Sequence, residues 1–101
     1  MLNAAPLIWL ILFFLRYYVR FSPQNDLSYL EKTFEKFQLS KREREIMKLI
    51  IQGRNNKEIE ELLFISYHTV KNHIYNLYQK LGIKHRGELV HLAIEARKNM
   101  G

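Results

Sequence analysis

The chain has 101 residues, which is room for one compact domain and little more, so a large multilayer enzyme is excluded. It contains no cysteine, which rules out disulfides, thiolate metal sites and cysteine nucleophiles. Its 16 Lys and Arg residues against 10 Asp and Glu give a formal net charge of +6, which favours a polyanionic partner such as nucleic acid or an anionic membrane surface.

The N-terminal segment is apolar. Residues 2–15 carry no charge, and the run from Pro6 to Leu15 is apolar on every face of a helix. A helix over these fourteen residues would be about 21 Å long, and extending it to Val19 gives about 27 Å, close to the roughly 30 Å of a hydrocarbon core. Arg16 and Arg20, interleaved with aromatic residues, follow the run as an interfacial belt does. We therefore predict a membrane-anchoring helix in residues 1–21, in contact with the membrane through residues 2–21.

Orientation follows from the same two arginines. By the positive-inside rule, they place the rest of the chain in the cytoplasm, at the inner face of the cytoplasmic membrane. Three alternatives stay open: an interfacial helix that does not cross, the last span of a longer membrane protein of which this chain is a piece, and a buried core helix of a cytoplasmic protein.

Residues 22–38 are expected to form a linker with a short amphipathic helix. The polar sequence Ser22-Pro-Gln-Asn25 ends the apolar helix, and Asp26 can cap a new one. One stripe of that helix is apolar: Leu27, Leu30, Phe34 and Phe37. A dimerising or signal-transmitting stalk would need about three or four heptads. We expect the stripe to pack on the following domain instead.

Residues 39–98 contain the start and stop signals of four helices. Ser40 with Glu43, and Asn55 with Glu58, have the capping-box spacing that begins a helix, and Gly53 suits a left-handed end. A third helix runs from the cap Ser66 to Gly82, and a fourth covers about residues 87–98. The expected buried positions are Ile46, Leu49, Ile50, Ile59, Leu62, Leu63, Val70, Ile74, Leu77, Leu81, Leu89, Leu92, Ala93 and Ala96. No strand is expected, so the fold class is all-α.

The second and third of these helices form a helix-turn-helix arrangement. A tight turn at Phe64-Ile65 joins a short helix to a longer one, and the second helix of such a pair enters the major groove of DNA. Opposite its core stripe, the longer helix presents Asn72, Tyr75, Asn76 and Gln79, flanked by Lys71, His73 and Lys80. Amides pair with adenine and lysine donates to guanine, and the face has no carboxylate to repel phosphate.

The motifs of this region resemble those of LuxR-type helix-turn-helix domains over about residues 39–96. They are Leu39-Ser-Lys-Arg-Glu-Arg-Glu-Ile, Gly53, Asn56-Lys-Glu-Ile59, Ile65-Ser66, Thr69-Val-Lys71, His73, Lys80-Leu-Gly-Ile83 and Arg86. The resemblance implies a four-helix DNA-binding domain, commonly dimeric through its last helix, at the output end of a bacterial transcription regulator. It implies that bases are contacted by Lys71, Asn72 and Tyr75. It implies that phosphates are held by Lys57, Thr69, His73, Asn76 and Lys80.

Glu60 departs from the family pattern, which usually has a small residue at this position. Since a buried unpaired carboxylate is costly, we expect Glu60 to lean outward or to find a basic partner. Asn55 stands where the family often has serine or threonine, and it still caps a helix.

Catalysis, metal binding and cofactors are not expected. The four histidines lack the spacing and the companion ligands of a metal site, and about sixty helical residues are poorly suited to building a catalytic pocket. We therefore predict that the chain is not an enzyme.

The expected partners are duplex DNA and a second copy of the chain. Val90 and Ile94 form an apolar edge outside the core stripe of the fourth helix, which predicts a homodimer on DNA. No receiver-like alternation of strands and helices is present, so the input comes from the membrane segment, a partner or sequence upstream. The rival hypothesis is a membrane-anchored helix-turn-helix module that binds protein; it would require an acidic or apolar outer face on the third helix.

Overall fold

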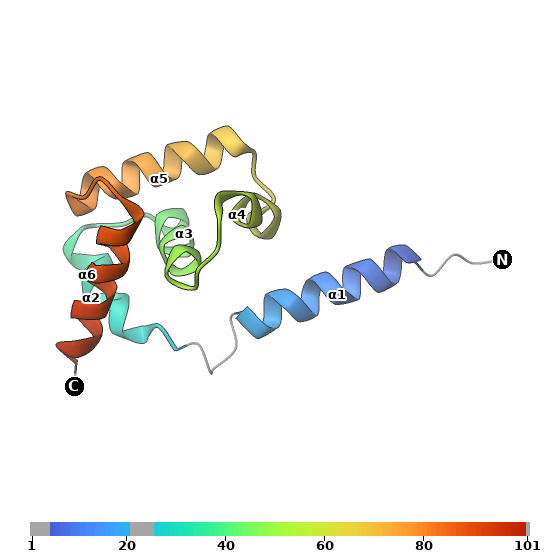
Figure 1. Ribbon diagram of the computed structural model, residues 1–101, viewed down its shortest axis with the longest axis horizontal. Helices are drawn as coiled ribbons and strands as arrows, with labels where there is room; N and C mark the ends of the chain where they lie inside the picture. Colours follow the sequence, from blue (N-terminus) through green and yellow to red (C-terminus); the bar gives the residue numbers. More distant parts are fainter. Residues whose placement is uncertain (1–4, 21–25, 101) are drawn as a thin grey trace.

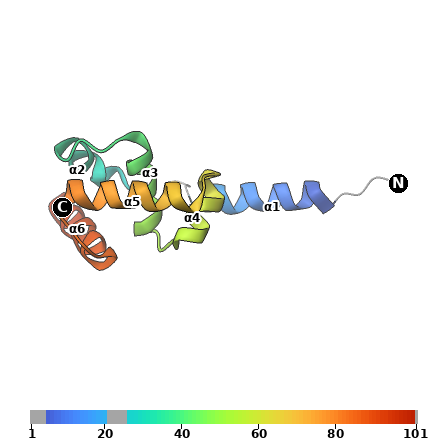
Figure 2. The same ribbon diagram turned by 90° about the horizontal axis from the view of Figure 1, so that it is seen from above.

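The computed structural model describes residues 5–20 and 26–100, without the side chains of residues 5 and 17–20. Its elements are α1 (Ala5–Arg20), the 3-10 turn η2 (Ser28–Leu30), α2 (Glu31–Lys36), α3 (Lys41–Ile51), α4 (Asn56–Leu63), α5 (Tyr67–Leu81) and α6 (Arg86–Lys98). Helices α2 to α6 pack together, and α1 projects from them (Figures 1 and 2). All regular structure in the described ranges is helical, which confirms the all-α class predicted from the sequence.

The starts of α3 and α4 are fixed by the two predicted capping boxes, and both are confirmed. In the first box, the backbone N–H of Glu43 donates to Ser40 Oγ at 3.2 Å, and the N–H of Ser40 donates to Glu43 Oε1 at 2.8 Å. In the second, the N–H of Glu58 donates to Asn55 Oδ1 at 2.8 Å, and the N–H of Asn55 donates to Glu58 Oε1 at 3.2 Å. Each box satisfies N–H groups that the helix itself leaves without partners.

Helices α3, α4 and α5 end at residues with a left-handed backbone conformation. Gly53 follows α3 with φ = 87°, and Gly82 ends α5 with φ = 69°, a region that glycine enters without steric cost. The turn after α4 places Phe64 there with φ = 57°, which is unusual for a bulky side chain. Ser66 then begins α5, where its Oγ accepts from the N–H of Thr69 at 3.2 Å. The turn between α4 and α5 therefore stands where the sequence predicted it.

The core sits between α2, α3, α4, α5 and α6. Its fully buried side chains include Phe34, Ile46, Leu49, Leu77 and Leu89. The predicted apolar stripes supply this core, although Leu63, Ile74, Leu92 and Ala96 are only partly buried against it.

The linker differs from the single amphipathic helix expected from the sequence. Asp26 Oδ1 accepts from the N–H of Ser28 at 2.9 Å, but the cap positions are Leu27 and Leu30, without side-chain cap bonds, and the segment is a 3-10 turn followed by a helix of only six residues. Leu30 and Phe34 are buried in the core, and η2 packs against α6. The expectation that this stripe packs on the following domain is therefore confirmed.

Most apolar side chains of α1 lie outside the core, although Phe13 is partly buried against it. Eight large ones are each more than half exposed: Leu7, Ile8, Trp9, Leu10, Ile11, Leu12, Phe14 and Leu15. The alternative of a buried core helix is therefore wrong for this stretch. None of the helices in the described part of the chain combines the length and the apolar character needed to cross a membrane, so the predicted membrane-spanning helix is not supported. The expected interfacial belt falls only partly within the described residues, because the structure describes the side chain of Arg16 but not that of Arg20.

Candidate nucleic-acid interface

Helix α5 lies along one side of the bundle with its outer face uncovered. Figure 1 shows it along the top, and the view from above in Figure 2 shows it in front of α3 and α4. Its inner face packs on both helices, with Val70 and Leu77 fully buried. Helix α4, the turn and α5 therefore form the helix-turn-helix unit expected from the sequence, with the longer helix free on the outside.

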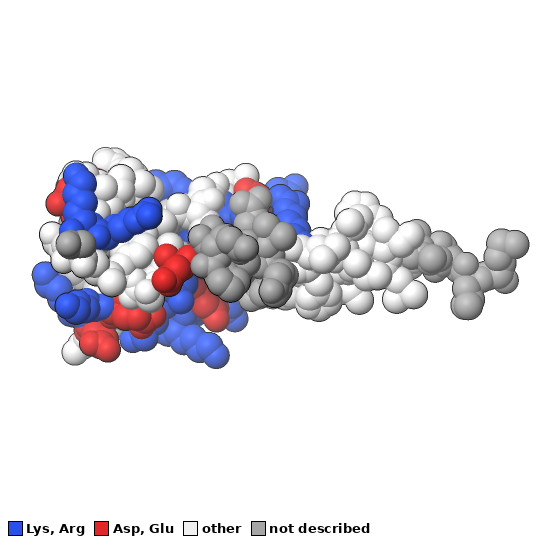
Figure 3. Space-filling model, turned by 90° about the horizontal axis from the view of Figure 1, so that it is seen from below, with Lys and Arg blue, Asp and Glu red and all other residues white. Residues whose placement is uncertain are grey.

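The predicted outer face of α5 is confirmed by exposure. Every residue expected to point directly outward is exposed: Asn72, Tyr75, Asn76 and Gln79. Tyr75 is 64% exposed. The helix contains no Asp or Glu, so this surface offers amides, a phenol and cations to a ligand. By contrast, the face seen from below, opposite α5, carries acidic as well as basic side chains (Figure 3).

Lys71 is exposed on the flank of this surface, and its position is constrained by an aromatic neighbour. Its Nζ lies 5.3 Å from the centroid of the Tyr67 ring, one helical turn earlier. Lys57, on the first turn of α4, is also exposed. Both ammonium groups are therefore available to a ligand that approaches the helix-turn-helix unit.

Thr69 and His73, two of the predicted phosphate contacts, are only partly exposed. The Thr69 hydroxyl already lies 2.9 Å from Ser66 Oγ, so it belongs to the cap at the start of α5. Either atom of that pair can donate, which leaves an acceptor or a donor for a phosphate oxygen. These two side chains lie beside the exposed face of α5 and not at its centre.

Lys80 has an internal partner that the sequence did not reveal. Its Nζ lies 2.7 Å from Glu43 Oε1 and donates to the carbonyl of Gln38 at 3.1 Å. The Glu43 side chain is 5% exposed. Burial raises the pKa of Glu43, but hydrogen bonds from Lys80 and Ser40 outweigh it, so the pKa lies below its ordinary value. Lys80 thus joins the end of α5 to the start of α3.

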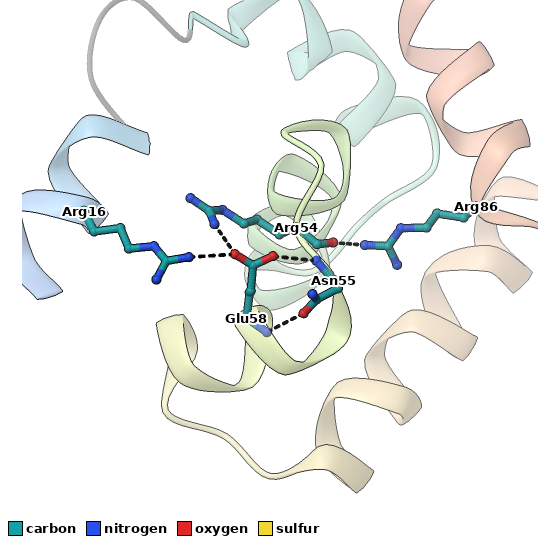
Figure 4. A network of polar contacts seen from close by, with 5 residues as sticks. All are labelled: Arg16, Arg54, Asn55, Glu58 and Arg86. Atoms are coloured by element: carbon teal, nitrogen blue, oxygen red, sulfur yellow. Dashed lines mark hydrogen bonds and ion pairs between the residues drawn. The ribbon is translucent and has the colours of Figure 1, made fainter.

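A second polar network holds α4 in place from two sides (Figure 4). Glu58 Oε2 pairs with Arg54, whose side chain is 2% exposed, and with Nη2 of Arg16 from α1 at 3.0 Å. From α6, Arg86 donates to the carbonyl of Arg54 and, at 3.3 Å, to Asn56 Oδ1. The Asn55 N–H is the main cause of a lowered pKa at Glu58, and Arg54 and Arg16 lower it further against the effect of burial.

Sequence reasoning missed the buried arginine in this network. Arg54 follows the helix-ending Gly53 and precedes the cap Asn55, a position that resembles an exposed loop. Glu58 four residues later was the available signal, because an acid at that spacing can pair with it. Glu60 was expected to avoid burial without a partner, and its side chain is partly exposed.

Helix α1 contacts the helix-turn-helix unit at its turn. The Phe13 ring lies 5.4 Å from that of Phe64, although Phe64 remains 80% exposed. On α6, Val90 and Ile94 are 37% and 49% exposed, so the apolar edge expected from the sequence lies at the surface.

Comparisons with known proteins agree on the region from α3 to α6. Residues 37–93 match the GerE family model, described as "Bacterial regulatory proteins, luxR family". The spore germination protein GerE of Bacillus subtilis is 52% identical over 61 residues, which are 59% of this chain and 82% of GerE. The oxygen regulatory protein NreC of Staphylococcus aureus is 49% identical over 59 residues, which are 58% of this chain but only 27% of NreC. No solved structure matches the chain.

Proposed function

Because the chain belongs to the luxR family of bacterial regulatory proteins, we propose that it regulates transcription by binding specific sequences of duplex DNA, with α5 in the major groove. This family consists of regulators and not of enzymes, in agreement with the prediction from the sequence. The observation that carries the proposal is the exposed, carboxylate-free face of α5 opposite a buried stripe. The rival hypothesis of a protein-binding module requires an acidic or apolar face there.

We assign base contacts to Lys71, Asn72 and Tyr75, which are exposed on the outer side of α5. Asn can bond adenine with two hydrogen bonds, Lys can donate to guanine, and Tyr can contact a base edge or a thymine methyl group. Phosphate contacts are assigned to Lys57, Thr69, His73, Asn76 and Lys80. For Lys80 this role requires it to give up or share its bond with Glu43.

The assignment separates two kinds of substitution in a gel-shift titration. Lys57→Ala should weaken binding to every duplex similarly. It should also reduce the slope of log affinity against log salt concentration by about one, because one phosphate contact is lost. Asn72→Ala should cost about 1 to 3 kcal/mol on the preferred site and little on unrelated duplexes. If both variants bind every duplex as the wild type does, α5 is not the reading helix.

We propose that the protein dimerises on DNA through Val90 and Ile94. Both side chains are exposed in the middle of α6, about one helical turn apart. An exposed apolar patch of this kind is typical of a protein–protein contact, and a second copy of the chain would remove it from water. A two-fold dimer would favour an operator with two half-sites about one helical turn apart.

We propose that α1 attaches the protein to the cytoplasmic face of the membrane. Its support is the exposed apolar surface of α1, which bears no charge before Arg16 and whose outer part is uncharged in Figure 3. Sixteen residues reach about 24 Å as a helix, less than a hydrocarbon core of roughly 30 Å, so a lone copy of this helix is better suited to the interface or to a bundle with other helices.

A further inference from the structure

The first turn of α5 contains an aromatic residue that the DNA-binding proposal does not use. Tyr67 is the first residue of the helix and is 49% exposed. Its ring lies under the ammonium group of Lys71, 5.3 Å from Nζ to the ring centroid, which is within the range of a cation–π contact. The ring of His68 stands edge-on to it at 6.0 Å. Lys71 is therefore directed back along α5 toward the N-terminal end of the helix.

That end of a recognition helix is the part that approaches base edges. A lysine side chain has four flexible bonds, and fixing it on a base costs much of its rotamer freedom. The Tyr67 ring limits this freedom before DNA arrives. It occupies one side of the ammonium group, so N–H donors on the other sides stay available for the O6 and N7 acceptors of guanine.

We infer that Tyr67 is a positioning residue for Lys71 and that it sharpens the choice of the base pair that Lys71 contacts. The inference rests on the proposed function, because it needs Lys71 to contact a base. The ring acts through its quadrupole and not through its hydroxyl group. Phenylalanine should therefore replace tyrosine, whereas side chains without a ring should not.

The test measures discrimination at a single base pair with the full chain. The base pair contacted by Lys71 is first located as the one at which Lys71→Ala loses its preference in a gel-shift titration. Tyr67→Leu and Tyr67→Gln should each reduce discrimination at that base pair by about two- to five-fold, as expected for an exposed cation–π contact. Tyr67→Phe should retain it. Far-UV circular dichroism and the thermal midpoint show that each variant is folded.

The double variant separates positioning from a direct contact. Tyr67→Leu should lower the affinity for the preferred duplex in the wild-type background but cause no further loss of that affinity in the Lys71→Ala background, because there is no longer a lysine to position. Equal losses with and without Lys71, a loss in Tyr67→Phe, or unchanged discrimination in Tyr67→Leu would each overturn the inference while leaving DNA binding intact. A wild-type chain without any sequence preference would instead overturn the proposed function.

Discussion

The contact between Lys80 and Glu43 gives the sharpest prediction about how the domain is held together. Replacing Lys80 by alanine leaves a carboxylate that is 5% exposed without the ammonium group now 2.7 Å from it, although the Ser40 N–H remains. A hydrogen bond to a charged group contributes about 1.5 to 3 kcal/mol, and the Lys80 side chain is 38% exposed, so solvent screening reduces that value. We expect Lys80→Ala to lower the free energy of unfolding by about 1 to 2 kcal/mol.

Urea titrations followed by far-UV circular dichroism measure this loss, with Lys57→Ala as the control. Lys57 is exposed, so its replacement should change stability by less than about 0.5 kcal/mol. The pKa of Glu43 is lowered in the folded state, so the pair stabilises the fold at neutral pH, and this contribution is lost as the pH falls through the folded-state pKa. The difference between wild type and Lys80→Ala should therefore shrink in acid.

The salt dependence of DNA binding provides a second test of the bond between Lys80 and Glu43. Because Lys80 has to share its ammonium group between Glu43 and a phosphate, Lys80→Ala should flatten the slope of log affinity against log salt by less than the value of about one expected for Lys57→Ala. If Lys80→Ala keeps the wild-type stability and flattens the slope as fully as Lys57→Ala does, the bond to Glu43 does not stabilise the fold.

Three further predictions concern the dimer, the membrane and the core. Val90→Glu with Ile94→Glu should abolish cooperative binding to a paired site in a gel shift while single half-sites are still bound, and retained cooperativity would place the dimer surface elsewhere. The full chain should stay with membranes during alkaline extraction, whereas a chain that starts at Ser22 should be recovered in the soluble fraction; release of the full chain by alkali would contradict the attachment. Phe34→Ala should destabilise the domain by about 3 to 5 kcal/mol in urea, since its side chain is fully buried, and a loss below about 1 kcal/mol would show that α2 does not complete the core.

The local features of the fold were predictable from the sequence because they depend on residues a few positions apart. The capping boxes at Ser40 and Asn55 involve spacings of three, and the exposed face of α5 follows from its period of 3.6 residues. The orientation of Asn72 and Tyr75 could thus be predicted before any contact was known.

The features that escaped prediction depend on packing between distant segments. Lys80 and Glu43 are 37 residues apart, and their pairing depends on how α5 crosses α3. Arg54 is likewise contacted from a distant segment, since Arg86 of α6 donates to its carbonyl. The linker was expected to be one helix, but the burial of Leu30 and Phe34 against the other helices favours a 3-10 turn and one short helix.

The central claim, sequence-specific reading of DNA by α5, is tested most directly by selecting duplexes from a randomised pool with the full chain in mild detergent at several salt concentrations. We predict that one motif is enriched, that its affinity falls steeply as salt rises, and that Asn72→Ala changes the enriched motif at one position. A pool that stays random for the wild type, or an enriched motif that Asn72→Ala, Lys71→Ala and Tyr75→Ala all leave unchanged, would contradict the claim.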